Sequence, residues 1–131
     1  MNHPVILIVD DEKETCQMLA EYIQTRLAGE VVIKSNGDAA IDFLNRSPVD
    51  VLFQDLHMPG LGGFAVIAKA QDRNKDLGIF VITNWEDPQF AKQIEACGGV
   101  YIPKPLSLKV VFMLLEKHLK TRGMLKRLPA G

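Results

Sequence analysis

The chain has 131 residues, 47% hydrophobic and 24% charged, which suits one globular domain with a single core and is too short for two. A formal net charge of −1 at pH 7 argues against a general attraction to nucleic acid or to a membrane surface. The longest apolar run, residues 110–115, is too short to span a bilayer, and residues 5–9 are too short for a signal-peptide core. We therefore expect a cytoplasmic protein, and the wide separation of Cys16 and Cys97 fits a reducing compartment.

Five short runs of β-branched and aliphatic residues predict strands that are buried on both faces of a parallel sheet. They lie at residues 5–9, 31–33, 49–53, 79–82 and 100–102. A segment of helical length and polarity follows each run and predicts a helix. These helices are expected near residues 12–28, 37–46, 63–73, 87–97 and 107–121.

Strict alternation of strands and helices predicts right-handed crossovers and an α/β fold with helices on both faces of the sheet. The doubly wound, flavodoxin-like (βα)5 arrangement, a five-stranded parallel sheet in the order 2-1-3-4-5, is the leading choice. In such sheets ligands bind beyond the carboxyl ends of the strands, where the strand order switches. We therefore expect the ends of the first and third strands to flank a site.

Acidic residues stand at both of these strand ends. The first strand is followed by Asp10, Asp11 and Glu12, and the third is followed closely by Asp55. Carboxylates so close together repel one another unless a counter-ion joins them. Hard oxygen ligands on short side chains suit Mg²⁺, which shares its coordination with phosphate oxygens. The pattern predicts a magnesium site that also takes a phosphate.

A hydroxyl and an ammonium group are expected at the same edge of the sheet, since Thr83 ends the fourth strand and Lys104 follows the fifth. Neither group helps to bind a bare cation. Both are useful if an anion forms there, because phosphoryl transfer spreads negative charge over three equatorial oxygens. In that case Asp55 is the nucleophile that attacks in line.

Four sequence segments together resemble the response-regulator receiver domains of two-component signal transduction. They are ValAspAspGlu at 9–12, AspLeuHisMetProGly at 55–60, Thr83, and TyrIleProLysPro at 101–105. Each alone is common, but all four in order, each at a predicted strand end, are specific. The resemblance covers roughly residues 4–121. It implies a receiver domain over residues 1–121 and a tail, residues 122–131, that is a frayed end or the stub of a linker.

The resemblance also implies a role for each matching residue. Mg²⁺, with Mn²⁺ as an alternative ion, would be held by Asp10, Asp11, Asp55 and the backbone carbonyl of His57. Asp55 would be the phosphoacceptor, with Lys104 pairing with the phosphoryl group and a cis bond between Lys104 and Pro105. Thr83 and Tyr101 would form the switch, the hydroxyl moving toward the phosphoryl group and the aromatic ring swinging inward.

The implied partners are a sensor histidine kinase or a histidine phosphotransfer protein, with no direct binding of nucleic acid and no membrane. The domain would catalyse only its own phosphorylation and dephosphorylation, and so would not act as an enzyme on other molecules. Phosphorylation would alter the surface of the fourth helix, fifth strand and fifth helix (the α4-β5-α5 face in receiver domains). Val110, Met113 and Leu114 lie outside the apolar stripe of the fifth helix and suggest a partner or homodimer contact there.

Simpler explanations exist for each residue: the acids after the first strand could cap a helix, and Asp55 could be a turn acid. Their joint placement favours the functional interpretation. His57 is expected to face solvent and to contribute only its backbone.

Four residues depart from the family pattern: Gln54, Gly62, Asn84 and Trp85. Gln54 and Asn84 bear on rates rather than on the chemistry. Gly62 stands where an acid often caps the third helix, so we expect no side-chain cap and a looser loop there. Trp85 lies two positions after Thr83, on the expected path of water. We therefore hypothesise slow autodephosphorylation.

Three other functions compete. An aspartate-nucleophile phosphatase of the haloacid-dehalogenase kind would place its nucleophile after the first strand, and the chain has no room for a cap domain. A flavodoxin-like FMN carrier is disfavoured because acids after the first strand would repel the FMN phosphate. A binding module that keeps the fold but is never phosphorylated remains the serious rival.

Overall fold

The computed structural model describes residues 3–58, 62–84 and 88–129. Five parallel strands form one sheet: β1 (Val5–Val9), β2 (Glu30–Lys34), β3 (Val51–Asp55), β4 (Gly78–Thr83) and β5 (Val100–Pro103). Their order is β2-β1-β3-β4-β5. The strand order therefore switches between β1 and β3, as predicted, while all the strands stay parallel. The predicted flavodoxin-like fold is confirmed.

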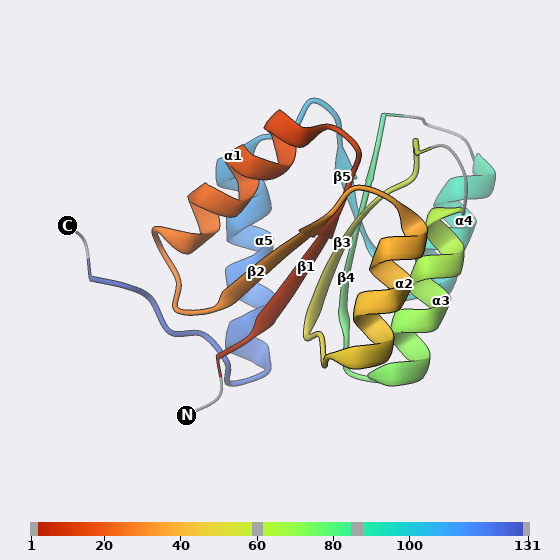
Figure 1. Ribbon diagram of the computed structural model, residues 1–131. Coiled ribbons are helices and arrows are strands. Elements are labelled where there is room, and N and C mark those ends of the chain that lie inside the picture. Colours follow the sequence, from red (N-terminus) through yellow and green to blue (C-terminus); the bar gives the residue numbers. More distant parts are fainter. Residues whose placement is uncertain (1–2, 59–61, 85–87, 130–131) are drawn as a thin grey trace.

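A helix follows each strand in the chain, and the five helices of the described residues cover both faces of the sheet (Figure 1). They are α1 (Lys13–Gln24), α2 (Gly37–Arg46), α3 (Gly63–Arg73), α4 (Pro88–Ala96) and α5 (Leu108–Thr121). Asn36 and Ser107 cap α2 and α5, because their side-chain oxygens accept hydrogen bonds from the backbone of the first turn. None of the helices in the described part of the chain has both the length and the apolar character that a membrane crossing needs.

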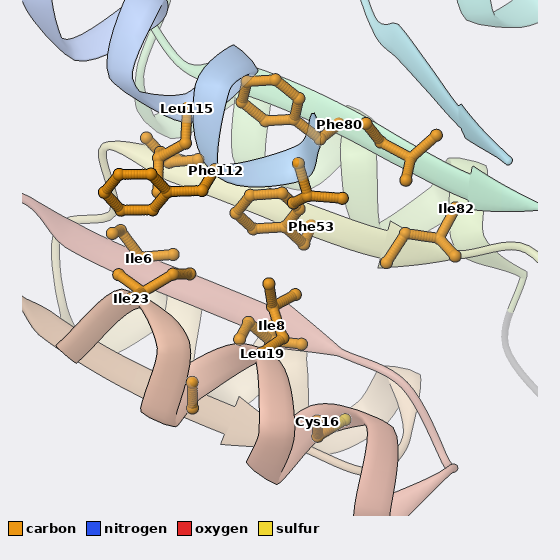
Figure 2. Packing of buried hydrophobic residues seen from close by; sticks show 14 of the residues in the cluster. Ile6, Ile8, Cys16, Leu19, Ile23, Phe53, Phe80, Ile82, Phe112 and Leu115 are labelled. Carbon is orange, nitrogen blue, oxygen red and sulfur yellow. The ribbon is translucent and has the colours of Figure 1, made fainter. Parts of the chain in front are cut away.

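Two layers of core lie on opposite faces of the sheet because side chains alternate along each strand. One layer packs β residues such as Ile6, Ile8 and Phe53 against α1 and α5, as the close view in Figure 2 shows. The other packs residues such as Leu7 and Leu52 against α2, α3 and α4. Burial on both faces explains why the central strands β1, β3 and β4 are continuous apolar runs rather than alternating ones. The prediction of burial on both faces is wrong for β2 and β5, because these strands lie at the edges of the sheet and are partly exposed.

The first helix ends earlier than predicted, and the chain beyond it contacts the tail. α1 stops at Gln24 with Thr25 as its C-cap, whereas the pattern predicted helix to residue 28. Leu27 points inward, 2% exposed, and forms an antiparallel bridge with Arg127. Leu27, which continues the helical pattern in the sequence, therefore lies beyond the end of the helix, and its side chain enters the same core layer as α1.

The tail is packed against the domain over residues 124–128. The Ala28 N–H donates to the Lys126 carbonyl at 2.9 Å, and the Leu128 N–H donates to the Arg26 carbonyl at 2.8 Å. Met124 and Leu125 pack on the α1–α5 core layer. This part of the tail is not a frayed end, and its interpretation as the start of a linker stays a prediction.

The core layer around α5 should dominate stability. Leu115, fully buried between α5 and the sheet, should cost about 2–5 kcal/mol of unfolding free energy when replaced by Ala, because a cavity remains. Met113 lies on the same helix but is 57% exposed, so Met113→Ala should change stability by no more than about 0.5 kcal/mol. Urea denaturation followed by circular dichroism measures both. Equal losses would contradict this placement of α5.

Candidate functional site

Three carboxylates meet where the sheet reverses its strand order. Asp10 and Asp11 follow β1, and Asp55 is the last residue of β3. One oxygen of each lies within 4.8 Å of the others. Asp10 and Asp55 are 1% and 0% exposed, whereas Asp11 is exposed. The predicted acidic cluster is therefore present, with two of its members buried.

The negative charge of the cluster is only partly balanced by the described residues. Burial raises the pKa of Asp10 to about 7, although the Glu12 N–H that donates to its Oδ1 opposes the rise, and the neighbouring Asp55 carboxylate adds to it. Asp10 Oδ2 and Asp55 Oδ2 are buried and have no hydrogen-bond partner among the described residues. Two such oxygens beside an exposed carboxylate fit a hard, hydrated divalent cation such as Mg²⁺.

Lys104 supplies one cation to this edge. Its Nζ lies 3.3 Å from Asp55 Oδ1 and 3.1 Å from Glu12 Oε1. Burial alone would lower the pKa of Lys104, but Glu12 and Asp55 outweigh it and the pKa is raised. Lys104 in turn lowers the pKa of Glu12. The ammonium is charged at neutral pH and held against Asp55, and the predicted cis bond between Lys104 and Pro105 is present.

Thr83 and His57 contact each other beside Asp55. Thr83, fully buried at the end of β4, has its Oγ1 2.6 Å from His57 Nε2. The Asn84 N–H donates to the same ring nitrogen at 3.3 Å, and the His57 N–H donates to Asp55 Oδ1 at 3.0 Å. The expectation that the His57 side chain faces solvent is wrong, because the ring is half-buried and bonded to Thr83.

The departures from the family pattern have local structural effects. Gln54 is 1% exposed and its Nε2 donates to the Asp55 carbonyl at 2.8 Å. A Cβ at Gly63 would lie 3.0 Å from that same carbonyl and 3.2 Å from Gln54 Cγ. Gly62 is the N-cap of α3 and, as expected, provides no side-chain cap. Trp85 lies outside the described residues.

Residues expected to switch or to bind partners are largely on the surface. Tyr101 is 41% exposed, and Val110 and Met113 are 50% and 57% exposed. Leu114 differs, since it is half-buried and packs against the α1–α5 core layer. Exposed apolar side chains are therefore present on β5 and on α5, but Leu114 is not one of them.

Two contacts were not anticipated from the sequence: Glu12 as a partner of Lys104, and the side chain of His57 as a partner of Thr83. Glu12 could have been included, because it continues the acidic run after β1. Nothing in the sequence marks the orientation of the His57 ring, which depends on the conformation of the loop after β3.

Comparison with known proteins agrees with this geometry. The family model for the response regulator receiver domain matches residues 6–116. A cyclic di-GMP phosphodiesterase of Thermotoga maritima is 30% identical over 119 residues, which cover 89% of this chain and 31% of that protein. The transcriptional regulatory protein BaeR of Escherichia coli is 31% identical over 120 residues, which cover 91% of this chain and 49% of that protein.

Solved structures show the same fold. Chemotaxis response regulator CheY4 of Vibrio cholerae has a TM-score of 0.77 at 26% identity, covering 90% of this chain and 100% of that one. A CheY-like receiver domain protein from Methanospirillum hungatei has a TM-score of 0.85 at 17% identity, covering 93% of this chain and 98% of that one.

The chain belongs to the response regulator receiver domain family, whose members accept phosphoryl groups from kinases and bind Mg²⁺ at an acidic cluster. It is a phosphoryl-accepting receiver domain of two-component signalling. It spans 31% and 49% of the length of the two curated relatives named above.

The buried charge cluster predicts a stability effect. Metal-free Asp55→Asn should be more stable than the parent at pH 8 by on the order of 1 kcal/mol, because one of two adjacent buried negative charges is removed. The gain should shrink below pH 7. Asp10, with a pKa of about 7, is then neutral in the folded parent, whereas an unfolded aspartate stays ionised to about pH 4.

The sign follows from proton linkage: folded Asp10 binds its proton more tightly than unfolded Asp10, so its stabilising contribution exists at low pH and is lost as pH rises through 7. Thermal melting in EDTA at pH 5 and pH 8 checks both statements. Glu95→Gln, which removes an exposed carboxylate on α4, is the control and should show neither effect. A lower melting temperature for Asp55→Asn at pH 8 would refute the assignment.

Proposed function

We propose that Asp55 is the residue that accepts the phosphoryl group, from a histidine kinase or a histidine phosphotransfer protein, in a magnesium-dependent reaction in the cytoplasm. The observation that carries this proposal is the position of Asp55. It is fully buried at the carboxyl end of β3, and Lys104 Nζ lies 3.3 Å from one of its oxygens. Its other oxygen has no hydrogen-bond partner among the residues that the structure describes. That oxygen is available for bonding to phosphorus or to a metal ion.

The transfer balances without any further reactant. A carboxylate oxygen of Asp55 attacks the phosphorus of an N-phosphohistidine, the P–O bond forms, and the P–N bond breaks with its electron pair returning to the donor imidazole. Lys104, already held against Asp55, offsets negative charge on the equatorial oxygens. The Thr83 hydroxyl, at the end of the neighbouring strand, is the donor for a second oxygen.

The proposed metal ligands are Asp10, Asp11, Asp55 and the backbone carbonyl of His57. The support is the orphaned oxygen on each buried carboxylate and the approach of all three side chains within 4.8 Å. When bound, Mg²⁺ neutralises the acids and polarises the phosphoryl oxygens. Mn²⁺ has the same ligand preference and would substitute for it.

The proposed output is a change at the surface of α4, β5 and α5. Tyr101, on β5, is 41% exposed in the present structure and is proposed to turn inward after phosphorylation. Val110 and Met113 are exposed on α5 and are proposed to contact a partner or a second copy. No activity on other molecules is proposed for this domain.

A mass measurement tests the acceptor. After incubation with a small phosphodonor and Mg²⁺, the intact protein should gain roughly 80 Da, the mass of one phosphoryl group. Asp55→Ala should gain nothing, whereas Asp38→Ala, which removes an exposed acid on α2, should gain the same mass as the parent. A parent that gains no mass, and shows no response to Mg²⁺ or beryllofluoride, would favour the unphosphorylated binding module instead.

Trp85 gives a separate prediction about lifetime, which rests on the sequence alone because this residue is outside the described part of the chain. If its indole slows the approach of water, Trp85→Ala should shorten the lifetime of phospho-Asp55. Phosphate release after removal of the phosphodonor measures this. An unchanged or longer lifetime would refute the hypothesis.

A further inference from the structure

His57 touches both residues between which the proposed phosphoryl group would sit. Its main-chain N–H donates to Asp55 Oδ1 at 3.0 Å, and its ring Nε2 lies 2.6 Å from Thr83 Oγ1. The ring is half-buried and comes from the segment after β3, whereas Thr83 ends β4. One residue therefore links the acceptor carboxylate to the hydroxyl on the neighbouring strand.

The direction of the hydrogen bond between His57 and Thr83 can be assigned from a third group. The main-chain N–H of Asn84 donates to His57 Nε2 at 3.3 Å. A ring nitrogen that accepts a hydrogen bond carries no hydrogen of its own. The 2.6 Å contact can then be a hydrogen bond only if the Thr83 hydroxyl donates to the ring. In this arrangement the imidazole is neutral, with its hydrogen on Nδ1.

This assignment has a consequence for the reaction, because a threonine hydroxyl has a single hydrogen to donate. While that hydrogen points at His57 Nε2, it is not available to a phosphoryl oxygen on Asp55. Thr83 is fully buried, so its hydroxyl must exchange one protein-bound acceptor for another rather than pass through bulk water. The ring of His57 and the phosphoryl group are thus alternative acceptors for one hydrogen.

We propose that His57 is a positioning residue that holds the Thr83 hydroxyl in the unphosphorylated protein and so opposes its donation to the phosphoryl group. The inference rests on the proposed function of Asp55 and Thr83. No covalent bond changes in this step, since the hydroxyl rotates and its hydrogen leaves the imidazole nitrogen for a phosphoryl oxygen. The contact sets the balance between the two arrangements of Thr83.

Three variants separate this role from a general effect on folding. His57→Leu removes the acceptor but fills similar space, and His57→Gln keeps an acceptor oxygen at the same number of bonds from Cα as Nε2. Thr83→Val removes the hydroxyl and keeps the side-chain shape. The main-chain N–H of His57 still reaches Asp55 in every variant, because it belongs to the backbone.

Calorimetric titration with beryllofluoride in the presence of Mg²⁺ measures how strongly the contact with His57 opposes donation by Thr83 to a phosphoryl-like group. His57→Leu should bind about three- to tenfold more tightly than the parent, the range expected for removing one competing hydrogen bond. His57→Gln should stay within about twofold of the parent. In the Thr83→Val background, His57→Leu should change nothing, since no hydroxyl remains to be held. Equal or weaker binding by His57→Leu with Thr83 intact would overturn the inference.

The same titration separates the function proposed for Asp55 from the role proposed for His57. A parent that binds no beryllofluoride would refute the proposed function and the inference with it. A parent that binds, with His57→Leu no tighter, would refute the inference alone. An independent check is ¹⁵N NMR of the imidazole of His57, assigned by its absence in His57→Gln. Hydrogen on Nδ1 supports the inference, and hydrogen on Nε2 overturns it.

Discussion

The burial of two neighbouring carboxylates is the constraint around which the rest of this site is organised. Asp10 and Asp55 are 1% and 0% exposed at adjacent strand ends, where an uncompensated charge is costly. Lys104 balances part of this charge but divides its contacts between Asp55 and Glu12. The remaining imbalance raises the pKa of Asp10 to about 7. It also leaves two buried carboxylate oxygens that no group in the described part of the chain hydrogen-bonds.

The sheet fixes these groups because its central strands β1, β3 and β4 are buried on both faces. Phe53, two residues before Asp55, stacks on Phe80 with ring centroids 4.9 Å apart. Such packing leaves the strand ends little freedom, so the acids cannot move apart to relieve their repulsion. His57 lies beyond the end of β3, so its ring is placed by the loop and by its contact with Thr83 rather than by the sheet.

The fold and the main site residues could be predicted from the sequence because the apolar runs, and the polar residues that end them, follow simple periodic rules. Asp10, Asp55 and Lys104 are placed by strand ends alone. The His57 ring could not be placed, since its direction depends on a loop conformation that no periodicity encodes. The end of α1 was also misjudged, because Leu27 continues the helical spacing yet is buried from a turn.

The packed tail determines where anything attached to the end of this domain would begin. Residues 126–128 are hydrogen-bonded to residues 26–28, and Arg127 pairs with Glu116 on α5. A chain continuing past Pro129 would start beside the corner that follows α1, near the amino ends of the strands (Figure 1). Fluorescent labels or affinity tags placed there would lie at the far end of the sheet from Asp55. The protein could then be immobilised with its acidic cluster still accessible.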